Sequence, residues 1–121
     1  MPEKDNLEHP VPEPWRSTFR QIADAFVAGD FQLRHHTVDG VAPVDPATAE
    51  RIAENVTVYG EPLAALNDAT WERSVYRWMD GYWHLLVDLT TRVEPVSDLT
   101  LHARLCDVDG PRLEIDSVHV P

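Results

Sequence analysis

Cysteine and basic residues are scarce in this 121-residue sequence. Cys106 is the single cysteine, so no disulfide can form within the chain, and a reducing compartment or a fold independent of disulfides is expected. Ten lysines and arginines stand against 21 aspartates and glutamates, and the formal net charge is −11. Nucleic-acid binding depends on many basic contacts to phosphates, so this balance argues against a nucleic-acid partner. A basic protein would instead be attracted to the chain.

Secretory, membrane-spanning and cofactor-binding signals are also missing. The opening residues MPEKDNLEHPVPEP have neither the basic nor the apolar region of a signal peptide. No apolar run approaches the roughly 20 residues that cross a bilayer. The common metal, hydrolase and phosphate-loop motifs are absent, and His35-His36 has no third ligand at a recognisable spacing. We expect a cytoplasmic protein with no membrane partner and no cofactor, and the sequence leans away from an enzyme.

The first half of the chain has helical periodicity. Residues 1–13 are rich in proline and charge, and we expect a flexible acidic arm that buries little, followed by a single domain over residues 14–121. Apolar residues recur at helical spacing from Trp15 to Val27, before Gly29. A second helix is predicted with Asp45 as N-cap, Pro46 in its first turn and Gly60 at its end. Glu61-Pro62 predicts a further short helical turn that carries Leu63 and Leu66.

From Thr70 onward the apolar period changes to two, which indicates strands. Asp80-Gly81 is a two-residue hairpin signal, residues 107–111 predict another turn, and the apolar parity slips near Asp116-Ser117, as a bulge would produce. The expected strands cover residues 70–79, 82–90, 98–106 and 112–120. The simplest fold is α+β: two to three helices on one face of a four-stranded antiparallel meander in the order 1-2-3-4. A cystatin-like or nuclear-transport-factor-like arrangement would accommodate it.

The Asp80-Gly81 turn fixes which residues face each other in the first hairpin. Trp78 then lies opposite Trp83, on a face that should be buried against the helices. On the second face Arg73 lies opposite Asp88, and we expect the two side chains within salt-bridge reach. A slip of one residue would move Asp88 to the apolar face.

The second face of the sheet carries the candidate chemistry. Two imidazoles and several carboxylates could perform acid–base work or bind a ligand there, although the solvated face of an ordinary antiparallel sheet has the same sequence pattern. Arg104 and Glu114 share this face. Trp71, Val75 and Leu86 indicate that something covers it, and with Arg73 they are the interface candidates. The catalytic candidates are His84, Asp88, His102 and Asp116.

The C-terminal part of the chain resembles a family of small uncharacterised bacterial proteins, common in actinobacteria. The matching segments are Asp88-Leu89, Ser97 to Leu101 and Glu114 to Val120, in about a third of the chain. The resemblance implies an α+β domain and transfers no catalytic residues. It draws attention to Asp98, Asp116 and His119.

Three functional hypotheses follow from these features. The leading one is a small acidic protein-binding module, for example an antidote-like protein that acts on a basic partner. The second is a ligand-binding or enzymatic pocket that uses the His/Asp face, and a small-molecule ligand would fit there. The third is a homodimer in which Trp71 and the second face pack against a second copy of the chain.

Overall fold

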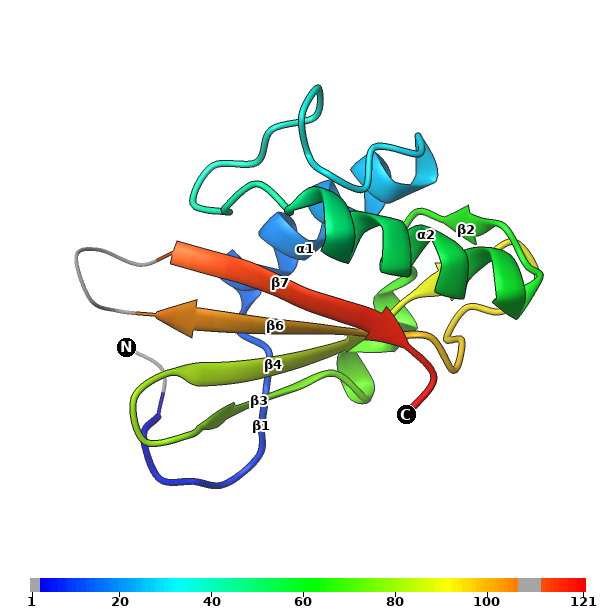
Figure 1. The fold of residues 1–121 in the computed structure, drawn as a ribbon. Coiled ribbons are helices and arrows are strands. Elements are labelled where there is room, and N and C mark those ends of the chain that lie inside the picture. Colours follow the sequence, from blue (N-terminus) through cyan, green and yellow to red (C-terminus); the bar gives the residue numbers. More distant parts are fainter. Residues whose placement is uncertain (1–2, 107–111) are drawn as a thin grey trace.

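A two-layer α+β arrangement is seen in the computed structural model, which describes residues 3–106 and 112–121 (Figure 1). The α+β class and the antiparallel sheet are confirmed. The turn predicted at residues 107–111 lies outside the described residues. No helix in the described ranges is long and apolar enough to cross a membrane. The elements are β1 (His9–Pro10), α1 (Glu13–Val27), α2 (Pro46–Tyr59), β2 (Leu63–Ala64), the 3-10 helix η1 (Asp68–Glu72), β3 (Val75–Trp78), β4 (Trp83–Asp88), β5 (Thr90–Thr91), β6 (Thr100–Cys106) and β7 (Arg112–His119).

The two α-helices begin and end close to the positions that the sequence predicts. The Asp45 carboxylate accepts a hydrogen bond from the Thr48 backbone N–H at 2.9 Å and so caps α2. Gly60 ends α2 with a φ of 88°, a conformation that glycine adopts without steric penalty. The apolar pattern of α1 runs to Val27, but Val27 is 48% exposed, whereas Ala25 is fully buried.

The main sheet has five strands in the order β1-β3-β4-β6-β7, all antiparallel. The four longer strands follow one another as the expected meander, and β1 adds a fifth at the β3 edge. A separate two-stranded sheet pairs Leu63 and Ala64 with Thr91 and Thr90. The helical turn predicted after Glu61-Pro62 is therefore wrong, because this backbone bonds to β5 instead of to itself.

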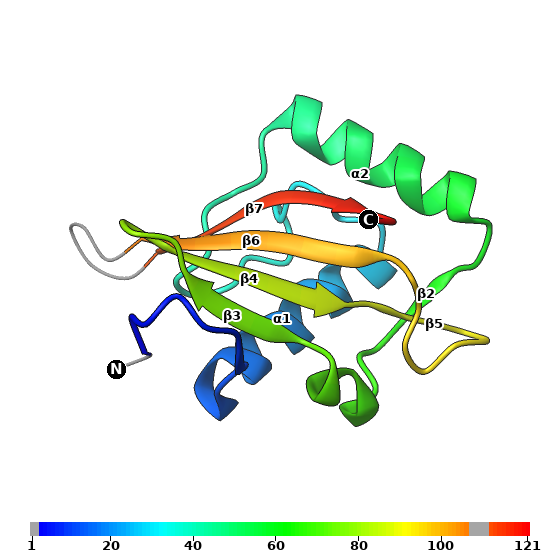
Figure 2. The ribbon, with the colours of Figure 1, turned by 90° about the horizontal axis from the view of Figure 1, so that it is seen from below.

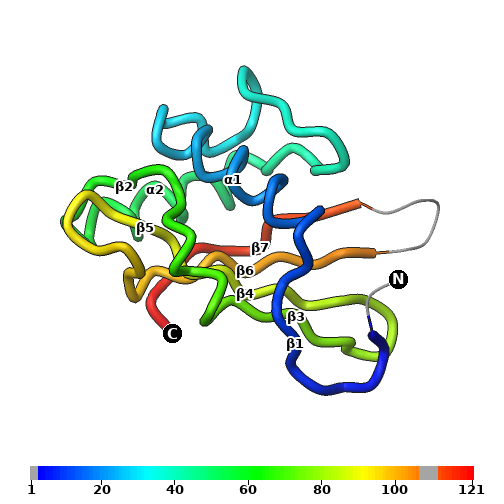
Figure 3. Tube along the Cα trace, turned by 180° about the vertical axis from the view of Figure 1, so that it is seen from behind, coloured from blue at the N-terminus to red at the C-terminus, as the bar shows by residue number. Residues whose placement is uncertain are grey.

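The segment before α1 lies along the β3 side of the sheet (Figure 3). His9 pairs with Tyr76, and the His9 ring stacks on the Tyr76 ring with centroids 5.2 Å apart. Val11 is completely buried, and the Glu3 backbone carbonyl accepts a hydrogen bond from the Trp83 indole at 3.1 Å. Residues 3–8 are exposed, so the buried part of this segment is Val11, beside the half-buried His9 and Pro12. The domain boundary at residue 14 stays a prediction.

The first hairpin has the expected register. Trp78 pairs with Trp83, and their rings meet edge to face with centroids 4.8 Å apart. Asp80 and Gly81 both have positive φ values, 62° and 145°. This conformation suits the tight turn between two twisted antiparallel strands.

Strand β7 contains the expected bulge. His102 pairs with Ser117 while Ala103 pairs with Ile115, so Asp116 is the extra residue. The extra residue restores the parity of the strand, and Val118 remains in the core with an exposure of 0%.

One hydrophobic core joins both helices to the inner face of the sheet. Phe19, Ile22 and Phe26 of α1 and Ile52 of α2 pack with alternate residues of β4, β6 and β7. The ribbon shows the two helices together on one side of the strands, with α2 beside β7 (Figure 2). Within residues 3–106 and 112–121 the other side of the sheet carries no helix, and most of the candidate residues lie there.

Candidate functional site

The outward side of the main sheet, here called the open face, is built by strand alternation. Residues paired across antiparallel strands share a face, so three rows of side chains cross the sheet. Every second residue of β4 is buried and the residues between are half-buried. The open face consists of Val75, Arg77, His84, Leu86, Asp88, Thr100, His102, Arg104, Glu114, Ser117 and His119.

A hollow of about 560 Å³ indents this face and is here called the acidic hollow. Three carboxylates from distant parts of the chain line it: Glu8 before β1, Asp88 at the end of β4 and Asp98 before β6. Its one lysine or arginine among the described residues is Arg73. The hollow therefore carries an excess of negative charge.

Apolar and neutral polar side chains complete the acidic hollow. Val75 and Leu86, which pair across β3 and β4, are half-buried, and Val120 is 52% exposed. Thr100 and His102 of β6 add a hydroxyl and an imidazole. The result is an aliphatic surface beside carboxylates.

Asp88 is the most firmly held of the three carboxylates. Its side chain is 15% exposed and accepts a hydrogen bond from the Thr100 hydroxyl at 2.9 Å. The Arg73 Nε lies 3.6 Å from Asp88 Oδ2, which confirms the predicted pair, but the Arg73 side chain is 63% exposed. A partly exposed contact of this length contributes little stability. Asp88 is therefore a fixed acceptor with a loosely held partner.

Three imidazoles, here called the imidazole row, lie next to one another on a diagonal across β4, β6 and β7. His84 and His102 have ring centroids 5.6 Å apart, and His102 stacks on His119 at 4.3 Å with an interplanar angle of 11°. The Ser117 hydroxyl lies 3.0 Å from His119 Nδ1. Stacked rings present their faces to each other, so their nitrogen lone pairs do not converge on one point. No group of three metal-binding side chains is found within residues 3–106 and 112–121.

His102 lies at the centre of this row. Burial lowers the pKa of His102 below its usual value of 6.5, and the neighbouring His119 and His84 lower it further, while Asp116 acts in the opposite direction. The ring is therefore neutral at pH 7. Its Nε2 is buried and has no hydrogen-bond partner among the residues that the structure describes. An unpaired buried polar atom is unfavourable and calls for an explanation.

The four catalytic candidates do not share one cavity. Asp88 and His102 line the acidic hollow, and His84 stacks beside His102. Asp116 belongs to a second hollow of about 270 Å³ near the start of α2. There its carboxylate accepts a hydrogen bond from Arg104 Nε at 2.9 Å, and this bond raises the pKa of Arg104.

Of the four interface candidates, Trp71 is not on the open face. The sequence predicts a strand from Thr70, but Asn67 caps the 3-10 helix η1 by accepting a hydrogen bond from the Ala69 N–H. Trp71 is consequently 5% exposed, under the guanidinium groups of Arg16 and Arg20 at 5.4 and 5.5 Å from the ring. The prediction that Trp71 lies on the second face of the sheet is wrong. The other three candidates, Arg73, Val75 and Leu86, line the acidic hollow.

His35 and His36 lie in a loop organised by Asp30. The Asp30 carboxylate accepts hydrogen bonds from the backbone N–H groups of Arg34, His35 and His36, and His36 Nδ1 lies 3.0 Å away. Desolvation raises the pKa of Asp30, but the hydrogen bonds from His36 and Arg34 outweigh it and hold the pKa well below its usual range. These contacts explain the loop without a bound group.

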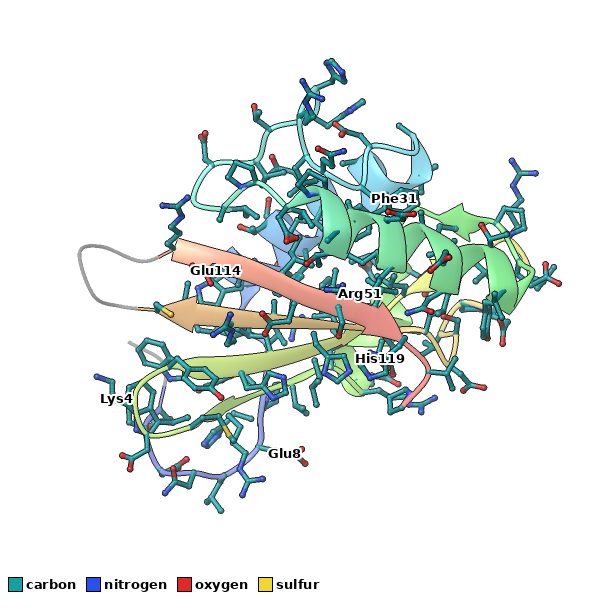
Figure 4. All side chains as sticks on the ribbon, viewed as in Figure 1. Lys4, Glu8, Phe31, Arg51, Glu114 and His119 are labelled. Atoms are coloured by element: carbon teal, nitrogen blue, oxygen red, sulfur yellow. The ribbon has the colours of Figure 1, made fainter. Side chains whose placement is uncertain are left out.

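The candidate residues predicted from the strand pattern did not include two residues of the open face and its hollow, His119 and Glu8. His119 was singled out by the family resemblance, but the predicted bulge was itself a sufficient signal, because a one-residue shift puts His119 on the same face as His102. Glu8 had no local signal, since it reaches the acidic hollow through the pairing of β1 with β3. Figure 4 labels Glu8, on the segment before β1, and His119, on β7.

Comparison with known proteins identifies a family for most of the chain. A family model described as a domain of unknown function, DUF7668, matches residues 23–121. No curated protein and no solved structure matches the chain. The match covers the whole of α2 and the four longer strands of the sheet, and it begins within α1.

Proposed function

Because the chain belongs to the family of the domain of unknown function DUF7668, whose description names no activity, we propose a function from the open face itself. The protein is a binding module that captures a basic segment of a partner protein at the acidic hollow. The observation that carries this proposal is the convergence of Glu8, Asp88 and Asp98 around one hollow on the open face. An antidote-like role toward a basic protein is one version of this function.

Charge supports a basic partner over a second copy of the chain. Each chain has a formal net charge of −11, and two open faces would bring their acidic hollows together. Like charges across an interface are unfavourable, whereas opposite charges accelerate encounter and select the partner. Self-association through this face is the competing outcome, and sedimentation at high protein concentration detects it.

Acid–base catalysis has weaker support from the same geometry. Asp116 is held by Arg104 in a different hollow, and His102 offers a buried nitrogen. A general base must reach the proton that it removes. A small-molecule ligand remains compatible with the acidic hollow, and it would carry positive charge for the same reason as a basic peptide.

The test uses an eight-residue peptide of alternating glycine and arginine as the probe. Isothermal titration at low salt should show binding that weakens as salt rises from about 0.02 to about 0.2 M, because screening shortens the range of the attraction. The double variant Asp88→Asn/Asp98→Asn should lose most of the binding. The control Asp24→Asn/Glu54→Gln removes the same charge from exposed helix positions and should lose little.

The comparison between these two variants decides the proposal. Equal losses in both would mean that the peptide responds to net charge alone, and the proposed site would be wrong.

The finer classification belongs to the same proposal: a cytoplasmic, bacterial, largely actinobacterial protein. The resemblance at Ser97–Leu101 and Glu114–Val120 supports this origin, and a cystatin-like or nuclear-transport-factor-like arrangement is part of the same proposal.

A further inference from the structure

The acidic hollow combines two surfaces that a long basic side chain requires. Val75 and Leu86 form an aliphatic surface, and Asp88 and Asp98 supply negative charge beside it. Lysine and arginine side chains bury their methylene stems along apolar surface while their charged ends contact polar groups. A free phosphate or a carboxylate would find neither a suitable charge nor a use for the aliphatic surface.

The hollow already contains a guanidinium from its own chain. Arg73 follows η1, and its Nε lies 3.6 Å from Asp88 Oδ2 while the side chain stays 63% exposed. Asp88 by contrast is held by the Thr100 hydroxyl. An incoming guanidinium can therefore replace Arg73 on a carboxylate that is already in position, and the displaced side chain returns to water with little loss.

The imidazole of His102, with its unpaired Nε2, adds a polar group to the lining of the hollow. His102 lines the hollow, and this nitrogen has no partner among the described residues although it is buried. One nitrogen of a neutral imidazole donates a hydrogen bond and the other accepts one, and a guanidinium brings five N–H donors. The ring as a whole is half-buried, so an arginine in the hollow would meet its accessible part and not the buried Nε2.

We propose that the acidic hollow is a receptor for one arginine side chain of the partner and that Arg73 occupies it as an internal competitor. This inference rests on the proposed function and specifies it, because it names the side chain that is recognised. It makes a prediction with an unusual sign: removal of a charged residue that lines the hollow, Arg73, strengthens binding.

The probes are three blocked tripeptides of the form Gly-X-Gly, with arginine, lysine or citrulline as X. Citrulline has nearly the shape of arginine but no charge, so it separates charge recognition from shape. NMR titration of the protein measures each affinity. The arginine tripeptide should bind at least about tenfold more tightly than the citrulline tripeptide, as expected for loss of a charge-assisted hydrogen bond.

Two substitutions and one control test the role of Arg73. Arg73→Gln should strengthen binding of the arginine tripeptide by about three- to tenfold, since it removes the competitor and a like charge. Arg92→Gln makes the same charge change at an exposed position outside the acidic hollow and should alter the affinity less than about twofold. Asp98→Asn, at an exposed position, should weaken binding without disturbing the fold.

Each outcome supports or overturns the inference. Weaker or unchanged binding by Arg73→Gln overturns the competitor role, and equal binding of the arginine and citrulline tripeptides overturns the receptor. Equal binding of lysine and arginine overturns the selection of guanidinium. If the tripeptides fail while the longer basic peptide still depends on Asp88 and Asp98, the inference fails and the proposed function stands; if both fail, the proposed function fails as well.

Discussion

The imidazole of His102 stacks on that of His119 with ring centroids 4.3 Å apart and an angle of 11° between the planes. The two rings come from adjacent strands and meet because the bulge at Asp116 shifts the pairing of β7 by one residue. Two protonated rings at this distance would repel each other. The stability of the folded chain is therefore expected to depend on pH through these two rings.

Stability should fall as the pH falls below about 6.5, because burial, His119 and His84 lower the pKa of His102 in the folded state. The unfolded chain binds a proton at its ordinary pKa of 6.5, and the folded chain binds it only at lower pH. The contribution of neutral His102 to the free energy of unfolding is fully present above pH 6.5. It is lost as the pH falls through the pKa of His102 in the folded state. Urea denaturation from about pH 8 to about pH 5 measures it.

The variant His102→Gln should flatten this pH dependence. His35→Gln is the matched control, since His35 is an exposed loop residue away from the imidazole row. If both variants retain the pH dependence of the original chain, His102 is not its source.

Val11→Ala should destabilise the protein by about 1–3 kcal/mol, because Val11 is fully buried and the change removes methyl groups from a packed site. Leu7→Ala alters a side chain that is 62% exposed and should change the free energy of unfolding by less than about 0.5 kcal/mol. Equal small effects in chemical denaturation would contradict the packing of this segment against the sheet.

Thr70→Val should destabilise the fold by about 1–3 kcal/mol through loss of a buried hydrogen bond. The Thr70 hydroxyl is buried and donates to the backbone carbonyl of Asp88, so its removal leaves that acceptor without this donor. Thr37→Val, at an exposed loop position, is the control. A loss no greater than that of the control would show that this hydrogen bond does not hold the end of β4.

Local signals in the sequence predicted the parts of the fold that depend on neighbouring residues. The Asp80-Gly81 turn determines the Trp78–Trp83 register, and the Asp45 cap determines where α2 begins. The Arg73–Asp88 pair follows from that register. Such features need only the chain within a few residues of the turn or cap.

Features that depend on distant contacts were not predictable in the same way. Strand β1 forms only because His9 and Pro10 pair with β3, and β2 forms only against β5. Glu8 reaches Asp88 and Asp98 through this long-range pairing. The sequence therefore predicted Asp88 as a candidate residue but did not predict the complete acidic hollow. Trp71 has apolar alternation around it, but the Asn67 cap starts a 3-10 helix that removes it from the open face.

The most direct test of the central claim is a map of where a basic segment binds. Backbone amide shifts, recorded by NMR at low salt during titration with the alternating glycine–arginine peptide, report the contact residues. The account predicts that the largest shifts cluster at Glu8, Arg73, Asp88, Asp98 and His102. Shifts centred on the helices or on the Asp30 loop, or no shifts at all, would contradict it.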